Sequence, residues 1–253
     1  REVVQAFAKG FDQGLDVDSI EAVTDAFLAG RDIVPTLHPN PVEIARQGIT
    51  VGEHVLPVHP AERRYSTVTM INTERRIIDT ATGRTNTATA GVPADRVDAF
   101  LAGYPHIKTD QATVIRRLTQ SGNGVDVIQA EAGTGKTWTL GRINELYVAE
   151  GHRVIGLTAA RTAVTELRSE GIDSYTVAQF MHDISRTSGP ALPNDAVVLI
   201  DEAAMISTRD WAQLMPVLHD ANAKIILCGD TGQLPEIDAG GVFRGLQTRL
   251  DAP

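Results

Sequence analysis

The stretch VDVIQAEAGTGKT, residues 125–137, decides the fold of this chain. It begins as an apolar strand and passes into a glycine-rich turn ending in Lys136 and Thr137, an arrangement that surrounds nucleotide phosphates. Gly133 and Gly135 lack a Cβ, so their N–H groups can turn toward a polyphosphate, and the following helix directs its positive dipole end at the same anion. The sequence therefore predicts that this segment binds ATP or a close relative.

Two side chains of this loop have predicted roles in phosphate binding. We expect Lys136 to reach the β- and γ-phosphates and Thr137 to place its hydroxyl on the Mg²⁺ that bridges them. The strict motif opens with glycine where this chain has Ala130, which matters only if the backbone there needs positive φ or has no room for a methyl group. The alternative is a glycine-rich strand-to-helix turn that binds nothing.

A second segment, AVVLIDEAAM at residues 196–205, reads as a buried parallel strand that ends in two acids. Parallel strands deliver side chains at their carboxyl ends, so we expect Asp201 to lie beside the phosphate loop and to hold Mg²⁺ through water. Glu202 could then polarise the attacking water as a general base. The alternative is an Asp-Glu pair that caps the following helix.

A third segment, KIILCGDTGQLPEIDAGGVF at residues 224–243, repeats the pattern of an apolar strand with polar residues at its exit. Gln233 can donate to the γ-phosphate or orient the attacking water, and it can change partners when the phosphate leaves. The alternative is a polar turn residue, which Pro235 and the Gly240-Gly241 pair also fit.

Together, AGTGKT, LIDEAAM and GDTGQLPEIDAGGVF resemble motifs I, II and III of superfamily 1 DNA helicases, with the closest match to the RecD-like branch. The preceding stretch YSTVTMINTERRIIDTA resembles the helix that leads into the motor region of conjugative relaxase-helicases of the TraI/TrwC (MobF) type. The resemblance implies an α/β fold: a RecA-like P-loop NTPase domain with a parallel sheet, preceded by a smaller, mostly helical N-terminal region.

The resemblance also implies further site residues. Gln111 fits the glutamine that reads adenine in the family, since an amide can both donate to and accept from an adenine edge. LTAARTAV, residues 157–164, resembles motif Ia, in which Thr158 and Arg161 would bind phosphate oxygens of single-stranded DNA. An exposed first-turn glutamine and a solvated helix arginine are the alternatives. The expected nucleotide-binding set is Gln111, Ala132, Gly133, Thr134, Gly135, Lys136 and Thr137.

The coarse pattern supports one nucleotide-binding core, residues 105–253, with strands at 125–129, 153–158, 196–200 and 224–228 joined by helices. Residues 1–104 form the accessory region, in which helices dominate and residues 31–64 are irregular or small β structure. We expect the apolar stripe Ile20, Val23, Phe27 and Leu28 to be core, and residues 80–91 to be an exposed loop or linker.

Composition bounds the possible functions. The 253 residues carry a net charge of −9, which argues against a broad basic DNA-binding surface, although backbone N–H groups and a few arginines can hold a single strand. No run approaches the ~18 apolar residues of a membrane span, so we expect no membrane partner and a bacterial, cytoplasmic location. The single cysteine, Cys228, excludes an internal disulfide.

The sequence thus predicts an ATP-dependent DNA helicase fragment that uses ATP and Mg²⁺ and acts on single-stranded DNA. Lys136, Glu202 and Gln233 would be catalytic, and Thr137 and Asp201 would hold the metal. We expect the second motor domain and the relaxase domain to lie elsewhere in the same polypeptide, so that this chain binds nucleotide better than it hydrolyses it. The alternatives are a RecD-type repair helicase and a non-catalytic DNA-docking or regulatory module that retains the fold.

Overall fold

The computed structural model describes residues 17–36, 48–51, 54–57, 64–130, 134–186, 192–230 and 241–250. Contacts divide the chain into two compact units, Arg1–Asn72 and Thr73–Pro253, which are described separately. Residues 73–104 therefore group with the larger unit. The functional division near residue 104, between an accessory region and a motor domain, stays a prediction.

The first unit contains one complete helix, α2 (Val17–Leu28), and four short strands among its described residues. Strand β1 (Ile33–Thr36) pairs antiparallel with β4 (Arg64–Thr67), and β2 (Gly48–Val51) pairs antiparallel with β3 (His54–Pro57), in agreement with the small β structure predicted here. The predicted core stripe of α2 is only partly right. Ile20 is buried, but Val23 and Phe27 are 37% and 47% exposed.

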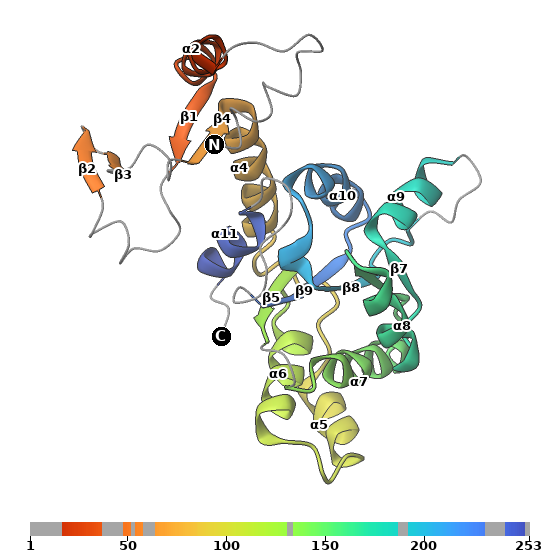
Figure 1. Cartoon of the computed structure of the whole chain (residues 1–253). Helices are drawn as coiled ribbons and strands as arrows, with labels where there is room; N and C mark the ends of the chain where they lie inside the picture. Colours follow the sequence, from red (N-terminus) through yellow and green to blue (C-terminus); the bar gives the residue numbers. More distant parts are fainter. Residues whose placement is uncertain are drawn as a thin grey trace. The chain divides into compact units, whose positions relative to one another are not determined.

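The second unit is built on a five-stranded parallel sheet (Figure 1). Its strands are β5 (Val125–Gln129), β6 (Val154–Thr158), β7 (Ser174–Thr176), β8 (Val197–Asp201) and β9 (Lys224–Gly229). The four predicted strands are confirmed, with ends that shift by at most one residue. The sequence did not reveal β7, because three residues are too few to show a periodic pattern.

The order of the strands places the three strands that lead into the motifs next to one another. The order is β5-β9-β8-β6-β7, so the last strand in sequence lies between the strand before the glycine-rich loop and the strand that ends at Asp201. All pairs are parallel, and the carboxyl ends of the strands therefore meet at the same side of the sheet.

Nine helical segments lie wholly or partly in the described part of this unit, and α4 begins at Val68, within the first unit. They are α4 (Val68–Thr82), α5 (Ala94–Ala102), α6 (Thr109–Gln120), α7 (Lys136–Ala149), α8 (Arg161–Ser169), α9 (Val177–Ser185), the 3-10 turn η2 (Ala203–Met205), α10 (Thr208–Asp220) and α11 (Val242–Arg249). Gly151 and Gly171 follow the C-caps of α7 and α8 and have φ of 87° and 79°, a left-handed conformation that suits glycine at helix ends. The α10 helix continues unbroken through Pro216.

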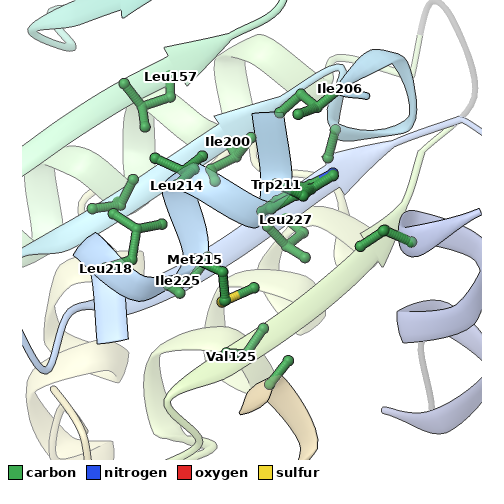
Figure 2. Close-up of a cluster of buried hydrophobic side chains, with 14 of the residues drawn as sticks. Val125, Leu157, Ile200, Ile206, Trp211, Leu214, Met215, Leu218, Ile225 and Leu227 are labelled. Carbon is green, nitrogen blue, oxygen red and sulfur yellow. The ribbon is translucent and has the colours of Figure 1, made fainter. Parts of the chain in front are cut away.

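The helices cover both faces of the sheet. On one face, side chains of α4, α9, α10 and α11 pack on strand residues such as Val125, Leu157 and Leu227. Figure 2 shows the centre of this cluster, where Trp211, Leu214 and other side chains of α10 meet the sheet. On the opposite face, α5, α6, α7 and α8 pack on the alternate strand residues. Because successive side chains of a strand point to opposite faces, the apolar strands contribute side chains to the hydrophobic clusters on both faces of the sheet.

The segment predicted as an exposed loop, residues 80–91, is so only in part: residues 83–91 are non-helical and most of them are exposed, but the segment is anchored to the unit at two residues. The α4 helix extends to Thr82, and Arg84 and Thr89 beyond it are buried. The Thr89 N–H donates to the carbonyl of Gly122, and the Gly124 N–H donates to the carbonyl of Arg84 at 2.7 Å. The prediction missed the helical residues 80–82 and the two buried residues, because Thr, Gly and Asn are common both in solvated loops and in turns that are fixed by backbone hydrogen bonds.

A buried ion pair lies at the amino-terminal edge of the sheet. The Lys224 ammonium, fully buried at the start of β9, contacts the carboxylate of Asp126 on β5. It also donates to Ser121 Oγ at 2.9 Å and to the Asn123 carbonyl at 2.6 Å, so its three hydrogens are satisfied. Burial lowers the pKa of Lys224. This ion pair thus links β5 and β9 near their amino-terminal ends, whereas the three motifs follow the carboxyl ends of their strands.

Candidate nucleotide-binding site

The glycine-rich loop and the strand that ends in acids meet at one ion pair. Lys136 is the first residue of α7 and Asp201 is the last residue of β8. Their Nζ and Oδ1 atoms are 2.7 Å apart, and the side chains are only 18% and 4% exposed. The structure therefore places a cation and a carboxylate side by side at the carboxyl edge of the sheet, although they are far apart in sequence.

The environment keeps this lysine charged. Burial disfavours the Lys136 ammonium, but the adjacent Asp201 carboxylate, which also accepts its hydrogen bond, outweighs burial and raises the pKa of Lys136. The same Asp201 oxygen accepts the N–H of Glu202 at 2.8 Å. The site consequently offers a fixed positive charge of the kind that binds phosphate oxygens.

The backbone before Lys136 has a conformation that suits glycine. Gly135 has φ of 80°, and its carbonyl accepts the N–H of Thr139 at 3.0 Å and the Thr139 hydroxyl at 3.1 Å. These bonds fix the first turn of α7, whose positive dipole end then faces the loop. Thr134 is exposed and lines the adjacent cavity. The predicted residues Ala132 and Gly133 lie outside the described part of the chain.

A cavity of 470 Å³ adjoins the loop, in the size range of small-molecule sites. Its polar lining includes Gln111 and Lys136, while Val114, Ile128 and Leu140 supply apolar walls. A planar apolar base with polar edges fits such a lining. The full lining is Asp110, Gln111, Val114, Ile128, Gln129, Ala130, Thr134, Lys136, Thr139, Leu140 and Cys228.

Gln111 shares this cavity with Lys136. It lies in the first turn of α6, and its Oε1 accepts the backbone N–H of Lys108 at 3.4 Å. Sequence reasoning missed the apolar neighbours, although helical spacing could have found them. Val114 follows Gln111 by three residues and Leu140 follows Lys136 by four, so each lies on the same helix face as its polar partner.

Ala130, the departure from the strict motif, causes no backbone strain. It is absent from the described residues with positive φ, and its N–H donates to the carbonyl of Gly229 at 3.1 Å. The methyl group is accommodated at the wall of the cavity. A glycine is therefore not required at this position of the loop.

Glu202 occupies an unusual backbone conformation directly after Asp201. Its φ and ψ of 53° and 36° lie in the left-handed region, which non-glycine residues adopt mainly at constrained sites. Its Oε2 accepts the hydroxyl of Thr158 at 3.4 Å. Burial, followed by the charge of Asp201, raises the pKa of Glu202, and a carboxylate of raised pKa is a stronger base.

The two residues expected to contact DNA have different environments. Thr158 is the last residue of β6, faces Asp201 in register and is fully buried. Arg161 begins α8 and is exposed. Thr137 lies within the first turn of α7 and is half-buried, next to Lys136. Gln233 lies outside the described residues.

Comparison with known proteins agrees with this geometry. The family profile described as AAA domain matches residues 106–253. The chain is 32% identical over 169 residues to the multifunctional conjugation protein TraI of Escherichia coli K12, an alignment that covers 64% of this chain and 9% of TraI. It is 31% identical over 189 residues to the conjugal transfer protein TraA of Rhizobium radiobacter, covering 74% of this chain and 17% of that protein.

A third relative extends the alignment further along the chain. The conjugal transfer protein TraA of Agrobacterium fabrum is 30% identical over 217 residues, which is 85% of this chain and 19% of TraA. The chain thus spans less than a fifth of the length of these relatives. In the described residues, no helix is both long enough and apolar enough to cross a bilayer.

The parallel sheet, the junction of Lys136 with Asp201 and the profile match lead to one assignment. The chain belongs to the AAA-domain family, and its α/β core is a RecA-like P-loop motor domain of the RecD-like type found in conjugative relaxase-helicases.

Proposed function

We propose that this chain binds Mg·ATP and hydrolyses it to drive movement along single-stranded DNA during conjugative transfer. The observation that carries the proposal is the 2.7 Å contact between Lys136 Nζ and Asp201 Oδ1. It joins a phosphate-binding cation to a carboxylate at the mouth of a cavity that is large enough for a nucleoside. The relatives' names, which refer to conjugation and conjugal transfer, support the biological setting.

The side chains at this junction fit Mg²⁺. The ion prefers oxygen ligands in octahedral geometry and retains several waters, and the site offers the carboxylate of Asp201 with the hydroxyl of Thr137 beside Lys136. Gly135, whose φ is positive, lets the backbone approach an anion. When bound, Mg²⁺ would neutralise charge on the β- and γ-phosphates.

Each side chain of the proposed site has a separate role in binding or hydrolysis. Lys136 exchanges its contact with Asp201 for the γ-phosphate, which holds the transferring group in place. Glu202 takes a proton from the attacking water, a role that suits a half-buried carboxylate of raised pKa. Gln111 recognises the adenine edge within the cavity. Gln233 senses the γ-phosphate.

On the DNA side, Arg161 is the proposed phosphate contact, because it is exposed at the start of α8. A single strand held by few contacts is compatible with a net charge of −9. The relatives are more than five times longer than the aligned region, so further domains of the same polypeptide are proposed partners.

The net charge of −9 also favours a second candidate, a docking module that keeps the motor fold without catalysis. Isothermal titration of Mg·ATP into wild type and Lys136→Ala separates the two. We expect loss of binding in Lys136→Ala and wild-type binding in Lys108→Ala, which removes an exposed lysine near the cavity. Equal affinity of wild type and Lys136→Ala for Mg·ATP would contradict the proposed motor function. An ATPase assay with and without single-stranded DNA then tests hydrolysis.

A further inference from the structure

The carboxylate of Glu74, on α4, lies between the starts of two later helices. Its Oε1 accepts the hydroxyl of Thr208, the first residue of α10, at 3.1 Å. A Cβ on Gly241, the N-cap of α11, would stand 3.8 Å from each of the two carboxylate oxygens. Glu74 is half-buried at this place and Thr208 is fully buried. One side chain of α4 therefore joins the start of α10 to the start of α11.

The start of α11 has no negative charge of its own. Its N-cap is Gly241, which has no side chain, and no acid occurs in its first turn. The first N–H groups of a helix have no partner within the helix, and they form the positive end of the helix dipole. The α10 helix, by contrast, has its own cap in Ser207. The carboxylate of Glu74 thus supplies to α11, from another helix, the charge that a local cap would provide.

Both helix starts border the turn that follows Glu202. Thr208 is the third residue after η2, so its bond to the carboxylate fixes one end of this turn. On the other side, Phe243 in the first turn of α11 packs against Gly229, and Gly229 packs on the backbone of Ala204 within η2. Side chains of α4, η2 and α11 belong to one apolar cluster. The position of η2 consequently depends on where α10 and α11 begin.

The conformation of Glu202 makes this support important. Its backbone is left-handed, with φ of 53°, a conformation that persists in a non-glycine residue only where the surrounding structure holds it. A general base acts only from within hydrogen-bond reach of the proton that it accepts, and a small displacement lowers the rate strongly. Contacts that hold η2 should therefore affect the rate of hydrolysis more than the binding of nucleotide.

We infer that Glu74 is a positioning residue that holds the starts of α10 and α11 together and thereby directs the Glu202 carboxylate at the attacking water. Glu74 is not among the residues that line the cavity, so it acts through the turn and not through the nucleotide. The inference rests on the proposed function, because it presupposes that Glu202 activates water.

Four variants separate the charge of Glu74 from its hydrogen bond. Glu74→Ala removes both, and Glu74→Gln keeps the size of the side chain and an acceptor oxygen but removes the charge. Thr208→Val removes the hydroxyl that Glu74 accepts and keeps the shape of a buried side chain, while Thr208→Ser keeps the hydroxyl. The double variant of Glu74→Ala with Thr208→Val tests whether the two residues act through the same contact.

Two controls match these variants. Asp79→Asn removes an exposed carboxylate from the same helix. Thr119→Val removes another fully buried hydroxyl, one that donates to the carbonyl of Ile115 in its own helix at 2.7 Å. For each protein, the rate of ATP hydrolysis is measured in single turnovers at saturating Mg·ATP, the Kd for Mg·ATP by titration, and the midpoint of urea unfolding by spectroscopy.

We expect the hydrolysis rate of Glu74→Ala to fall about tenfold or more, because the base is displaced. Glu74→Gln and Thr208→Val should each lose about threefold to tenfold, and the double variant should be no slower than Glu74→Ala. Kd for Mg·ATP should stay within about twofold of wild type in all of them. Thr208→Ser and both controls should hydrolyse ATP at the wild-type rate.

A purely structural role would give a different result. Lower unfolding midpoints together with wild-type hydrolysis rates in Glu74→Gln and Thr208→Val would overturn the inference, even if Glu74→Ala did not fold. A rise in Kd that accounts for the whole loss of activity would overturn it as well, since Glu74 would then act on binding. Absence of hydrolysis in the wild-type chain would refute the proposed function together with the inference, whereas hydrolysis that none of the variants alters would refute the inference alone.

Discussion

The side-chain amide of Gln111 lies against the backbone of Gly135, so that its Nε2 is 2.9 Å from the point where a Cβ on Gly135 would stand. The positive φ of 80° favours glycine here, and a Cβ at this position would push the flexible Gln111 amide aside. Gly135→Ala should therefore lose stability by about 1 kcal/mol and should also displace Gln111, lowering affinity for ATP roughly tenfold or more.

Gly151→Ala is the control for backbone strain. Gly151 has φ of 87° but no atom within 4 Å of an added Cβ, so it shares the conformation of Gly135 without its neighbour. Urea unfolding should show similar losses for the two variants, and titration with Mg·ATP should show a binding defect only in Gly135→Ala. Equal affinity in both variants would refute a role for the contact between Gln111 and Gly135.

The pairing of Lys136 with Asp201 predicts a non-additive effect on stability without nucleotide. Lys136→Met leaves the Asp201 carboxylate, which is 4% exposed, without its cation, at an expected cost of about 1–3 kcal/mol. Adding Asp201→Asn removes the unpaired charge and should restore part of the loss. A double-mutant cycle by urea unfolding measures this coupling. Strictly additive losses would mean that the pair contributes nothing in the free protein.

The strands and their functional ends were predictable from the sequence because the apolar runs before Lys136 and Asp201 are long and uninterrupted. Three such runs with polar exits, together with the parallel arrangement, are enough to place Lys136 and Asp201 at the same edge. What the sequence could not supply was the strand order. The insertion of β9 between β5 and β8 depends on packing between residues that are distant in the chain.

The environment of Thr158 shows the limit of motif-based prediction. The resemblance to a DNA-contacting motif rests on the residues adjacent to Thr158 in the sequence. The burial of Thr158 depends instead on the pairing of β6 with β8, in which Thr158 faces Asp201. Similarly, residues 80–91 have the composition of a solvated loop, and the burial of Arg84 and Thr89 within this segment depends on tertiary hydrogen bonds such as that from the Gly124 N–H to the Arg84 carbonyl. Local sequence carries little information about such distant partners.

The buried ion pair at the opposite edge of the sheet should matter for stability and not for nucleotide binding. Asp126→Asn leaves the fully buried Lys224 ammonium without a carboxylate, at an expected cost of about 3 kcal/mol. The double variant Asp126→Leu with Lys224→Met replaces both charged groups with apolar side chains and should recover much of the lost stability. Asp98→Ala breaks an ion pair whose side chains are 45% and 61% exposed, and it should cost less than about 1 kcal/mol.

Urea unfolding and Mg·ATP titration on the same proteins check this prediction. Affinity for nucleotide should be unchanged in every folded variant, since the pair lies at the amino-terminal ends of β5 and β9. A loss in Asp126→Asn no larger than that in Asp98→Ala would show that burial does not raise the cost of breaking the pair.

Close packing at Gly229 should link the end of β9 to the catalytic turn. A Cβ at Gly229 would lie 2.8 Å from Cζ of Phe243 on α11 and 3.2 Å from the backbone N of Ala204 in η2, two residues beyond Glu202. Gly229→Ala should therefore cost about 1–3 kcal/mol through overpacking and should also slow ATP hydrolysis by shifting the turn that holds Glu202. Adding Phe243→Leu makes room on one side and should recover stability more than activity, because the Ala204 backbone cannot yield in the same way.

Gly91→Ala is the control. Nothing lies within 4 Å of a Cβ added there, so this variant should match wild type in both stability and the rate of ATP hydrolysis. If Gly229→Ala had wild-type stability and rate, the packing of β9 against η2 would be looser than these distances require.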